Sequence, residues 1–238
     1  MKNTELKSIL EAHHKWLDGE PDGCRANLSG ADLSGRDLSG CILSFSDLSN
    51  CDLSGCKLIG SYLGNCNLSH SYMVDCILQW SNLHGSDMSG SDLTNSDLRG
   101  ANLCDVNLRG AKLCDAKNVD KVIWNATTEF YPLQCPEEGA FIGWKKVHNR
   151  IVKLEICADA LRSSATSRKC RCSSAKVLAI ENIDGSEYRN LVRSDYDPYF
   201  TYKVGEIVKV ENFDTNRWNE CAPGIHFFIT REEAVKYS

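Results

Sequence analysis

The chain has 238 residues, and its 32 acidic and 27 basic side chains give a formal net charge of −5 at pH 7. This length allows one or two domains. No apolar run approaches the roughly 18 residues that a membrane-spanning helix needs, so the composition excludes a helical membrane protein. The N-terminus has no hydrophobic signal core, and we therefore expect a soluble protein of the cytoplasm.

The first 25 residues predict an amphipathic helix followed by a short linker. The helix runs from Thr4 to Leu17, and Gly19 with Pro21 ends it. Its apolar side chains gather on one face: Leu6, Ile9, Leu10, Trp16 and Leu17. Such a face needs an apolar surface to cover, and the segment that follows supplies one.

Residues 26–117 repeat with a period of five. Every fifth residue from Leu28 to Leu113 is Leu or Met, and the residue two places before it is mostly Ala, Ser or Cys. A period of five fits neither a helix of 3.6 residues per turn nor a strand of period two. One short unit must therefore turn a regular corner each time, with Leu and the small residue inward and Ser-Gly pairs at the turns. The pattern predicts a solenoid whose coils hydrogen-bond to one another.

This segment resembles the pentapeptide-repeat family. The family signature, a small residue followed by Asp or Asn and then Leu, is present in Ala31-Asp32-Leu33, Ala101-Asn102-Leu103 and Ser91-Asp92-Leu93. The resemblance implies a right-handed, four-sided β-helix with four units in each coil. A solenoid exposes its core at its ends, so we expect the N-terminal helix to cap the first coil.

Thirteen cysteines could indicate disulfides, but five of them stand at inward repeat positions: Cys41, Cys51, Cys56, Cys66 and Cys76. There they alternate with Ala and Ser and act as small apolar residues. We interpret them as reduced thiols, which is consistent with a cytoplasmic protein.

Outward positions that break the polar pattern are candidates for contact with a partner. The apolar and aromatic residues at such positions are Ile42, Phe45, Ile59, Tyr62, Tyr72, Ile77 and Trp80. Exposed apolar clusters often mark contact surfaces. Three occupants remain open from the sequence: the C-terminal half of the chain, a second copy that would make a homodimer, or another protein.

Members of the quinolone-resistance group within this family act as mimics of duplex DNA on gyrase, which implies a strongly negative rod. Here residues 26–117 hold ten acidic and six basic side chains. A whole domain also follows the repeats where that group has a dimerisation helix. DNA mimicry is therefore a weaker alternative.

The repeat stops near residue 118. Residues 118–138 predict a plug and linker, with Ile123, Trp124, Phe130 and Tyr131 closing the last coil. Residues 139–238 predict a small mainly-β domain of α+β type, in which Thr230 to Glu233 forms a capping box that opens a final helix. Its candidate strands are Phe141–Val147, Ile151–Cys157, Ala175–Glu181, Tyr199–Lys203, Glu206–Val210 and Ile225–Ile229.

A basic, hydroxyl-rich stretch lies between the second and third of these strands. We predict that it is a loop, and its candidate anion-binding residues are Arg162, Ser163, Ser164, Arg168, Lys169 and Arg171. Guanidinium and hydroxyl donors suit phosphate or carboxylate. The alternatives are a solvated basic loop and a loop that binds the acidic side chains of the repeats.

A second stretch brings Cys221 and His226 close together across a turn. With Cys170 and Cys172 they form a weak candidate for a zinc site, because C-x-C with C-x₄-H is looser than the usual spacing. If the chain is an enzyme, Cys221, His226 and Arg168 are the candidate catalytic residues. A structural turn is the third alternative, and we expect no resident cofactor or metal.

The chain as a whole resembles phage- and prophage-associated pentapeptide-repeat proteins that carry a C-terminal domain of uncharacterised function. The resemblance rests on segments such as Phe141-Ile-Gly-Trp-Lys-Lys and Glu220-Cys-Ala-Pro-Gly-Ile-His-Phe-Phe. We predict a non-enzymatic binding protein, monomeric or homodimeric, whose C-terminal domain binds an acidic or phosphate-bearing partner in a bacterial cell. The alternative is an enzyme that acts on a nucleotide or on a protein side chain.

Overall fold

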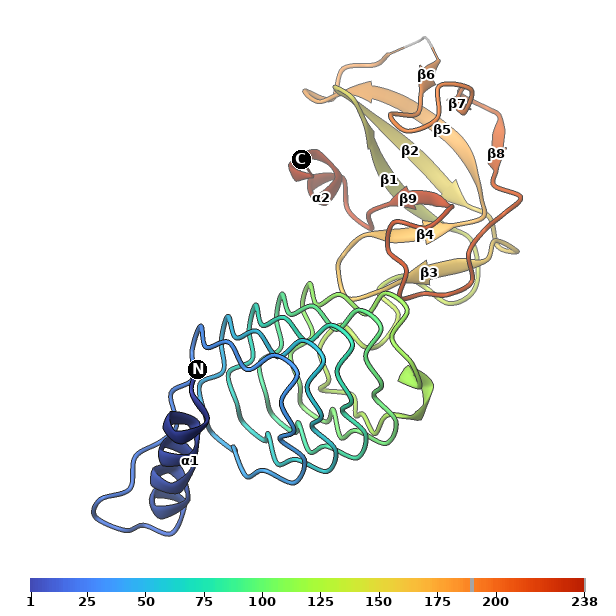
Figure 1. Cartoon of the computed structure of the whole chain (residues 1–238). Coiled ribbons are helices and arrows are strands. Elements are labelled where there is room, and N and C mark those ends of the chain that lie inside the picture. Colours follow the sequence, from blue (N-terminus) through green and yellow to red (C-terminus); the bar gives the residue numbers. More distant parts are fainter. Residues whose placement is uncertain (189–190, 238) are drawn as a thin grey trace. The chain divides into compact units, whose positions relative to one another are not determined.

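The computed structural model describes residues 1–188 and 191–237. The chain divides into two compact units, Met1–Pro132 and Leu133–Ser238, which we call the repeat unit and the C-terminal unit. Figure 1 shows successive coils in the first and packed strands in the second. None of the described helices is long and apolar enough to cross a membrane.

The repeat unit is a β-helix whose coils contain four five-residue units each. Parallel bridges join residues 20 apart, as in Asp32 to Asp52 and Asp52 to Tyr72. The N–H of Leu33 donates to the carbonyl of Asp52 at 2.8 Å, and the N–H of Asp52 donates back to Ala31 at 3.0 Å. The Leu and Met side chains at every fifth position are buried. The predicted solenoid is confirmed, and its right-handed sense stays a prediction.

Several small inward residues connect neighbouring coils through the same type of hydrogen bond, from the side chain to a backbone carbonyl. The Cys76 thiol donates to the carbonyl of Leu53 at 2.8 Å, and the Ser86 hydroxyl donates to that of Leu63 at 2.5 Å. Each acceptor lies 23 residues before its donor. Cys and Ser are therefore interchangeable here because both are small donors. All thirteen cysteines of the chain are free thiols, and burial raises the pKa of Cys76 to about 12, which keeps it protonated.

Each corner of the coil requires a left-handed backbone conformation. Most corners carry Gly, Asn or Asp, which tolerate it, but Phe45 has φ of 69° and Trp80 has φ of 58°. A Cβ atom at Gly100 would collide with the Trp80 ring, so the ring lies against the corner one coil further on. Trp80 is 64% exposed despite this contact.

The last coil continues beyond the five-residue pattern. Ile123 bridges to Asn102 and Glu129 bridges to Asn107, although the short 3-10 helix η1 (Val119–Lys121) interrupts the spacing. Tyr131 is buried, and its hydroxyl donates to the carbonyl of Val119 at 2.7 Å. Residues 118–132 thus belong to the repeat unit.

Helix α1 (Asn3–Leu17) lies across the first coil, as Figure 1 shows. Leu6 and His13 are its buried residues. The His13 ring accepts the N–H of Ala26 at 3.2 Å through Nδ1 and stacks on Trp16 with centroids 5.6 Å apart. Burial lowers the pKa of His13, which keeps the ring neutral. The Arg36 guanidinium also donates to the side chain of Asn3 and to the carbonyl of Met1, so both ends of the helix have polar contacts with the first coil.

The C-terminal unit contains two main sheets. The first has the order β1-β2-β5-β8, with β1 (Phe141–Val147), β2 (Arg150–Ile156), β5 (Ser174–Asn182) and β8 (Ile207–Lys209). The second has the order β3-β4-β9, with β3 (Arg162–Ser164), β4 (Cys170–Cys172) and β9 (Ile225–Phe227). The pair β6 (Val192–Arg193) and β7 (Thr201–Tyr202) and helix α2 (Arg231–Lys236) complete the unit. All the paired strands in these sheets are antiparallel.

One apolar core is shared by the two main sheets. Val152 and Ile156 of β2, Val177 of β5, Cys172 of β4 and Phe227 of β9 are among its buried members. The mainly-β character of this region is confirmed. The capping box also forms: the Thr230 hydroxyl accepts the N–H of Glu233, and the Glu233 side chain accepts the N–H of Thr230.

The basic stretch between Arg162 and Cys172 differs from its prediction as a loop. Both of its ends are strands, and β3 pairs with β4 in the order Arg162 to Cys172, Ser163 to Arg171 and Ser164 to Cys170. Strand β4 then pairs with β9. Hydroxyl and guanidinium groups concealed the strands, because they are satisfied inside the sheet rather than by water.

Candidate functional site

A cavity of about 840 Å³ opens in the C-terminal unit. It lies among the end of β1, β7, the segment after β8, β9 and the C-terminal residues. Its ionisable and aromatic lining residues are Lys145, Lys146, His148, Lys169, Asp195, Tyr196, Asp197, Phe200, Tyr202, Lys209, Glu211, Cys221, His226, Phe228 and Tyr237. The lining therefore combines four lysines and several aromatic rings with three carboxylates.

Lys145 enters this cavity from the inward face of β1. Side chains alternate along a strand, so Lys145 shares its face with the buried residues Gly143 and Val147. Its Nζ donates to the carbonyl of His226 at 3.4 Å and lies 5.9 Å from the centre of the Tyr202 ring. Burial lowers the pKa of Lys145 to about 8, Lys169 lowers it further, and Asp195 opposes the change.

His226 faces the same cavity as a neutral ring. Its Nε2 lies 2.8 Å from the carbonyl of Glu220, and because a carbonyl can only accept, Nε2 carries the proton. Burial lowers the pKa of His226 to about 4, with smaller contributions from Lys169, Lys145 and Arg171. The positive charge of the cavity at neutral pH therefore comes from lysines and not from this imidazole.

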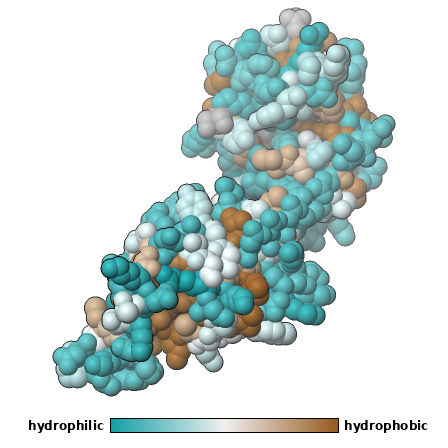
Figure 2. Space-filling view, viewed as in Figure 1, coloured by the Kyte–Doolittle hydropathy of each residue, from teal (hydrophilic) through white to brown (hydrophobic). Residues whose placement is uncertain are grey.

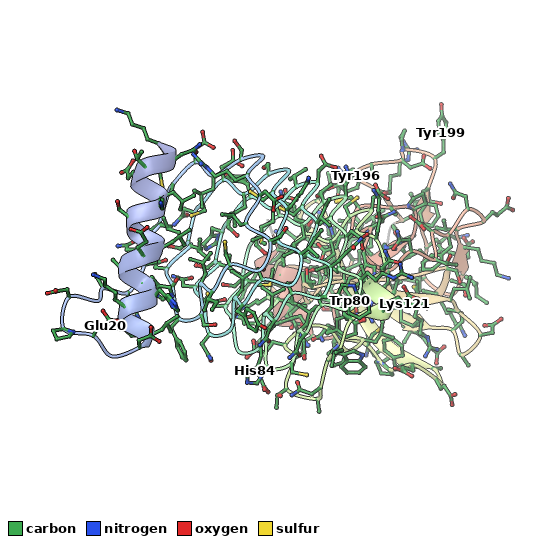
Figure 3. The ribbon with its side chains drawn as sticks, turned by 60° about the horizontal axis from the view of Figure 1, so that its bottom comes forward. Glu20, Trp80, His84, Lys121, Tyr196 and Tyr199 are labelled. Carbon is green, nitrogen blue, oxygen red and sulfur yellow. The ribbon has the colours of Figure 1, made fainter. Side chains whose placement is uncertain are left out.

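The other charged groups of the cavity are more exposed. Lys169 lies 5.6 Å above the Tyr237 ring, and Lys146 donates to the carbonyl of Tyr237 at 2.5 Å. Asp195 lies 2.7 Å from Nδ1 of His148 and accepts that residue's N–H at 3.2 Å. Tyr196 is 88% exposed, and Tyr199, which is 92% exposed, projects outward in Figure 3. Polar and aromatic side chains thus form the rim, and Lys145 lies deeper.

Only Lys169 among the six sequence-predicted anion-binding residues lines this cavity. Arg168 forms an ion pair with Glu233 at 2.7 Å and also donates to the side chain of Gln134. Arg162 donates to the carbonyls of Pro136 and Cys157 at 3.0 and 2.9 Å.

The two serines and the last arginine of that set are buried. Ser163 and Ser164 lie inside the unit, and the Ser164 hydroxyl accepts the N–H of Gln134 at 2.8 Å. Arg171 is 2% exposed and donates to the carbonyls of Asp214, Asn216 and Pro223 at 2.9 to 3.1 Å. Its guanidinium group therefore fixes the 213–223 segment.

The candidate zinc ligands do not come together. Arg171 pairs with His226 across the β4–β9 ladder, so these two side chains share one face, while Cys170 and Cys172 point to the other. Both of these cysteines are fully buried, whereas Cys221 is exposed. No cluster of three or more His, Cys, Asp or Glu suited to a metal occurs within residues 1–188 and 191–237. The C-x-C spacing itself places the thiols opposite the histidine.

Cys221 and His226 both line the cavity, as their proximity in sequence predicted. The printed hydrogen bond of the imidazole goes to a backbone carbonyl and not to the thiol. The structure therefore places the pair at one site without a thiol–imidazole hydrogen bond.

The predicted apolar patch of the repeat unit is distributed over several faces. Ile42 and Tyr62 are bridged and share one row, whereas Tyr72 belongs to the row of Asp52 and Asp92, two corners away. Ile77 lies in the row between these two, beside the corners that carry Ile59 and Trp80. Phe45 is in contact with Trp16 of the capping helix, with ring centroids 6.3 Å apart. Figure 2 shows separate apolar areas among polar side chains on the face of this unit that is in view.

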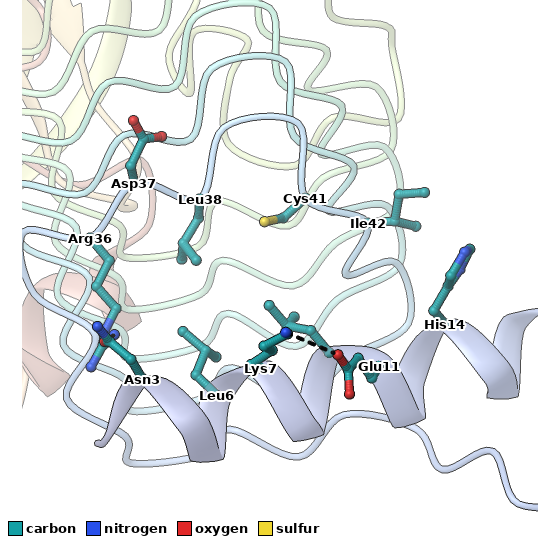
Figure 4. Close-up of a pocket in the computed structure, with 11 residues that line it drawn as sticks. Asn3, Leu6, Lys7, Glu11, His14, Arg36, Asp37, Leu38, Cys41 and Ile42 are labelled. Atoms are coloured by element: carbon teal, nitrogen blue, oxygen red, sulfur yellow. Dashed lines mark hydrogen bonds and ion pairs between the residues drawn. The ribbon is translucent and has the colours of Figure 1, made fainter.

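A second cavity of about 680 Å³ lies between α1 and the first coil. Figure 4 shows Leu6 and Lys7 of the helix opposite Leu38, Cys41 and Ile42 of the coil, with Lys7 paired to Glu11. Because this cavity is open space between the helix and the coil, α1 covers the first coil incompletely.

Lys145, Lys146 and Lys209 were missed by sequence reasoning. One signal was present in β1: Phe141, Gly143, Lys145 and Val147 alternate, which places a lysine on the buried face. The adjacent Lys146 concealed it, because a Lys–Lys pair at a strand end is typical of a solvated surface.

The repeat segment matches known proteins in two ways. Residues 26–65, 51–90 and 81–117 match the family model for pentapeptide repeats. The pentapeptide-repeat protein alr5209 of Nostoc PCC 7120 is 30% identical over 49% of this chain and 84% of its own, with a TM-score of 0.28. This chain belongs to the pentapeptide-repeat family.

Two further solved structures share the repeats. HetL of Nostoc sp. strain PCC 7120, a protein involved in regulating heterocyst differentiation, is 27% identical over 42% of this chain, with a TM-score of 0.36. QnrB1, a plasmid-mediated fluoroquinolone resistance protein, is 19% identical over 44% of this chain and 67% of its own, with a TM-score of 0.28. The chain spans 55% of the length of HetL.

The C-terminal unit has a different relationship. Residues 131–234 match the model of a family of unknown function, DUF5758. No curated protein matches the chain. Ligand chemistry in this unit must therefore be argued from its own side chains.

Proposed function

We propose that the chain is a non-enzymatic binding protein in which a pentapeptide-repeat scaffold carries a C-terminal domain that binds a phosphate-bearing or acidic ligand. The observation that carries this proposal is the cavity with Lys145, Lys146, Lys169 and Lys209 in its lining. Lysine binds phosphate as a compact point charge, so several lysines around one space suit an anion.

The character of the lining refines the ligand class. The cavity is lined by four lysines and three carboxylates, and one of these carboxylates, that of Asp195, also accepts the N–H of His148. Tyr202, Phe200 and Tyr237 supply apolar surface beside the amines. A ligand pocket of this kind combines a mostly apolar wall with a few polar groups that fix orientation. We therefore propose a small ligand, or the end of a partner, that has an anionic group and an apolar body.

The test compares cavity and non-cavity lysines in the full chain. Inorganic pyrophosphate is the probe, and Lys169→Gln/Lys209→Gln is the variant, because both lysines line the cavity without being fully buried. Lys176→Gln is the matched control, since Lys176 is exposed on β5 and lies outside the cavity.

We expect pyrophosphate to raise the melting temperature of the wild type and of Lys176→Gln. Its affinity for the double variant should fall about tenfold or more, and salt should weaken all binding. If pyrophosphate left the melting temperature of the wild type unchanged, or bound the double variant as tightly, the proposed ligand class would be wrong.

We propose a separate role for the repeat unit as a contact surface for a protein partner. The support is that Ile42, Tyr62 and Trp80 are large, apolar and exposed at positions that are otherwise polar or Gly. The second copy of a homodimer is the other occupant that such a surface suits.

The setting that we propose is the cytoplasm of a bacterial cell, with a phage-associated origin. It is supported by the resemblance of the sequence and by free thiols at the inward repeat positions.

A further inference from the structure

The deepest amine of the C-terminal cavity has no carboxylate partner among the described ion pairs. Lys203 pairs with Glu206 and Lys112 pairs with Asp92, but the contacts of the Lys145 Nζ are the carbonyl of His226 at 3.4 Å and the Tyr202 ring at 5.9 Å. Neither contact is a strong partner for an ammonium ion. A half-buried lysine held in this way costs free energy unless its charge is removed or used.

The surroundings of Lys145 favour its neutral form. Burial beside Gly143 and Val147 is the largest cause of its lowered pKa. The nearby carboxylate of Asp195 opposes this shift, and the charge of Lys169 adds to it. A pKa of about 8 leaves a useful fraction of free amine near neutral pH, whereas an exposed lysine with a pKa of about 10.4 has almost none. A free amine is a nucleophile, and an ammonium ion is not.

The site around this amine has the other parts that a covalent ligand site needs. Open space lies next to it, since Lys145 lines the cavity of about 840 Å³. Lys169 and Lys209 line the same space, where they can hold an anion. The Tyr202 ring is 2% exposed, and burial raises the pKa of its hydroxyl, so it flanks the amine as a neutral aromatic wall.

We propose that Lys145 forms a reversible imine with an aldehyde or ketone that also carries a phosphate group, which the neighbouring lysines hold. The proposal rests on the proposed function, because the anion site positions the carbonyl compound. It goes further by assigning the ligand class and the atom that bonds to it.

The chemistry needs no oxidant, reductant or further reactant. The Nζ lone pair attacks the carbonyl carbon, a C–N bond forms, and the carbonyl electron pair moves to oxygen, which takes up a proton. The nitrogen loses a proton to water, which gives a carbinolamine. The hydroxyl takes up a second proton from water and leaves as water, while the nitrogen lone pair forms the C=N bond. The protonated imine then returns its remaining N–H proton to water, so that the sum is amine plus carbonyl compound giving imine plus one water. Hydrolysis reverses each step, so the bound state is covalent but not permanent.

Lys145 is favoured over its neighbour as the bonding amine. Lys146 donates to two backbone carbonyls, those of Val235 and Tyr237, and its pair of donors holds the C-terminal residues. By the alternation of β1 it also faces away from Gly143 and Val147. The two adjacent lysines therefore have different roles, and a test must separate them.

The test uses pyridoxal 5′-phosphate as the probe on the full chain, with borohydride reduction of any imine and fragmentation mass spectrometry of the peptides. The variants are Lys145→Arg, which keeps a cation but cannot form the imine, and Lys145→Met, which keeps the apolar part. Lys176→Arg, on the exposed face of β5 outside the cavity, is the matched control. Pyridoxal, the same aldehyde without phosphate, shows whether an anion site directs the reaction.

We expect the first label at Lys145, with a yield that rises as the pH passes through about 8. Lys176→Arg should label as the wild type does, and both Lys145 variants should lose the early label. Pyridoxal should label about tenfold less at equal concentration. Pyrophosphate should compete with pyridoxal phosphate for the site.

Two results would overturn the imine. One is a label spread evenly over exposed lysines, and the other is an unchanged early label in both Lys145 variants when circular dichroism shows that they are folded. If pyrophosphate still raised the melting temperature in that case, the anion-binding function would survive and only the covalent step would fall. If pyrophosphate had no effect on the wild type, the proposed function itself would fall.

Discussion

The two units of this protein use the same residue types under different rules. In the repeat unit the position of a residue within its five-residue unit fixes its environment: Cys66 and Ser96 are both inward and both donate to a backbone carbonyl of another coil. In the C-terminal unit the environment depends on strand pairing. Lys145 and Lys146 are adjacent, yet one enters the buried face and the other holds the chain end.

This difference determines in which unit a functional side chain is hard to recognise from the sequence. A periodic segment reveals its fold and leaves few residues that depart from the pattern. An aperiodic segment can contain an unusual environment that its composition does not reveal, as with Arg171, which is more buried than any other arginine within residues 1–188 and 191–237. Substitutions of arginine and of cysteine, each made once in each unit, test this comparison directly, and a third pair tests the corners of the repeat unit alone.

The largest difference is expected between two arginines. Arg171→Ala removes donors from the carbonyls of Asp214, Asn216 and Pro223, so we expect a loss of about 3 kcal/mol in the free energy of unfolding. Arg36→Ala restores the small residue that the repeat pattern favours at that position and removes only partly exposed contacts with Asn3 and Met1. Its cost should stay below about 1 kcal/mol.

Denaturant unfolding followed by circular dichroism measures both arginine variants. Equal losses for the two would contradict the claim that Arg171 organises the 213–223 segment.

A smaller difference is expected between two cysteines. Cys172→Ser places a hydroxyl in an apolar core where the thiol lies 3.8 Å from the carbonyl of Ile225, too far for a good hydrogen bond, and should cost about 2 kcal/mol. Cys76→Ser should cost less than about 0.5 kcal/mol, because Ser96 makes the same kind of bond one coil further on. Thermal unfolding of both variants is the measurement. A costly Cys76→Ser would show that sulfur size, and not hydrogen bonding, decides that position.

The smallest change in the free energy of unfolding is expected for Trp80, because the repeat fold does not require its side chain. Trp80→Gly relieves a left-handed backbone and loses the contact over Gly100, so the two changes should nearly cancel, within about 1 kcal/mol. Phe45→Gly has the same backbone gain but also loses the contact with Trp16, and it should be less stable. If Trp80→Gly lowered stability more than Phe45→Gly, the Trp80 ring would stabilise the repeat unit itself, and it would not be available as a contact for a partner.

The sequence predicted the repeat unit well because its information is periodic. Leu28 to Leu113 determine the interior, and a coil of four units explains the bridges between residues 20 apart. The last coil was harder, since Ile123 and Glu129 continue the ladder after the spacing changes at η1. No local pattern in the sequence marks that continuation.

The C-terminal unit was predicted in outline only. Strand β1 and the Thr230 capping box follow from local signals, and both are present. Strands β3 and β4 were missed because a three-residue strand of Arg and Ser has no hydrophobic alternation to reveal it. The candidate site depends on that sheet. The pairing of β4 with β9 places Arg171 and His226 on one side of the sheet, and Cys170 and Cys172 on the other.

The bridges between residues 20 apart also constrain how the repeat unit can change its length. Removing or adding one full coil keeps each later residue in its row, so Asp87 would still follow Asn67 or its equivalent. Inserting a single five-residue unit moves each later residue around one corner, and the row that Ile42 shares with Tyr62 would then continue with residues from a neighbouring row. Such a scaffold can grow by gene duplication in steps of 20 residues without disturbing its surfaces, while a step of five rewrites all of them downstream.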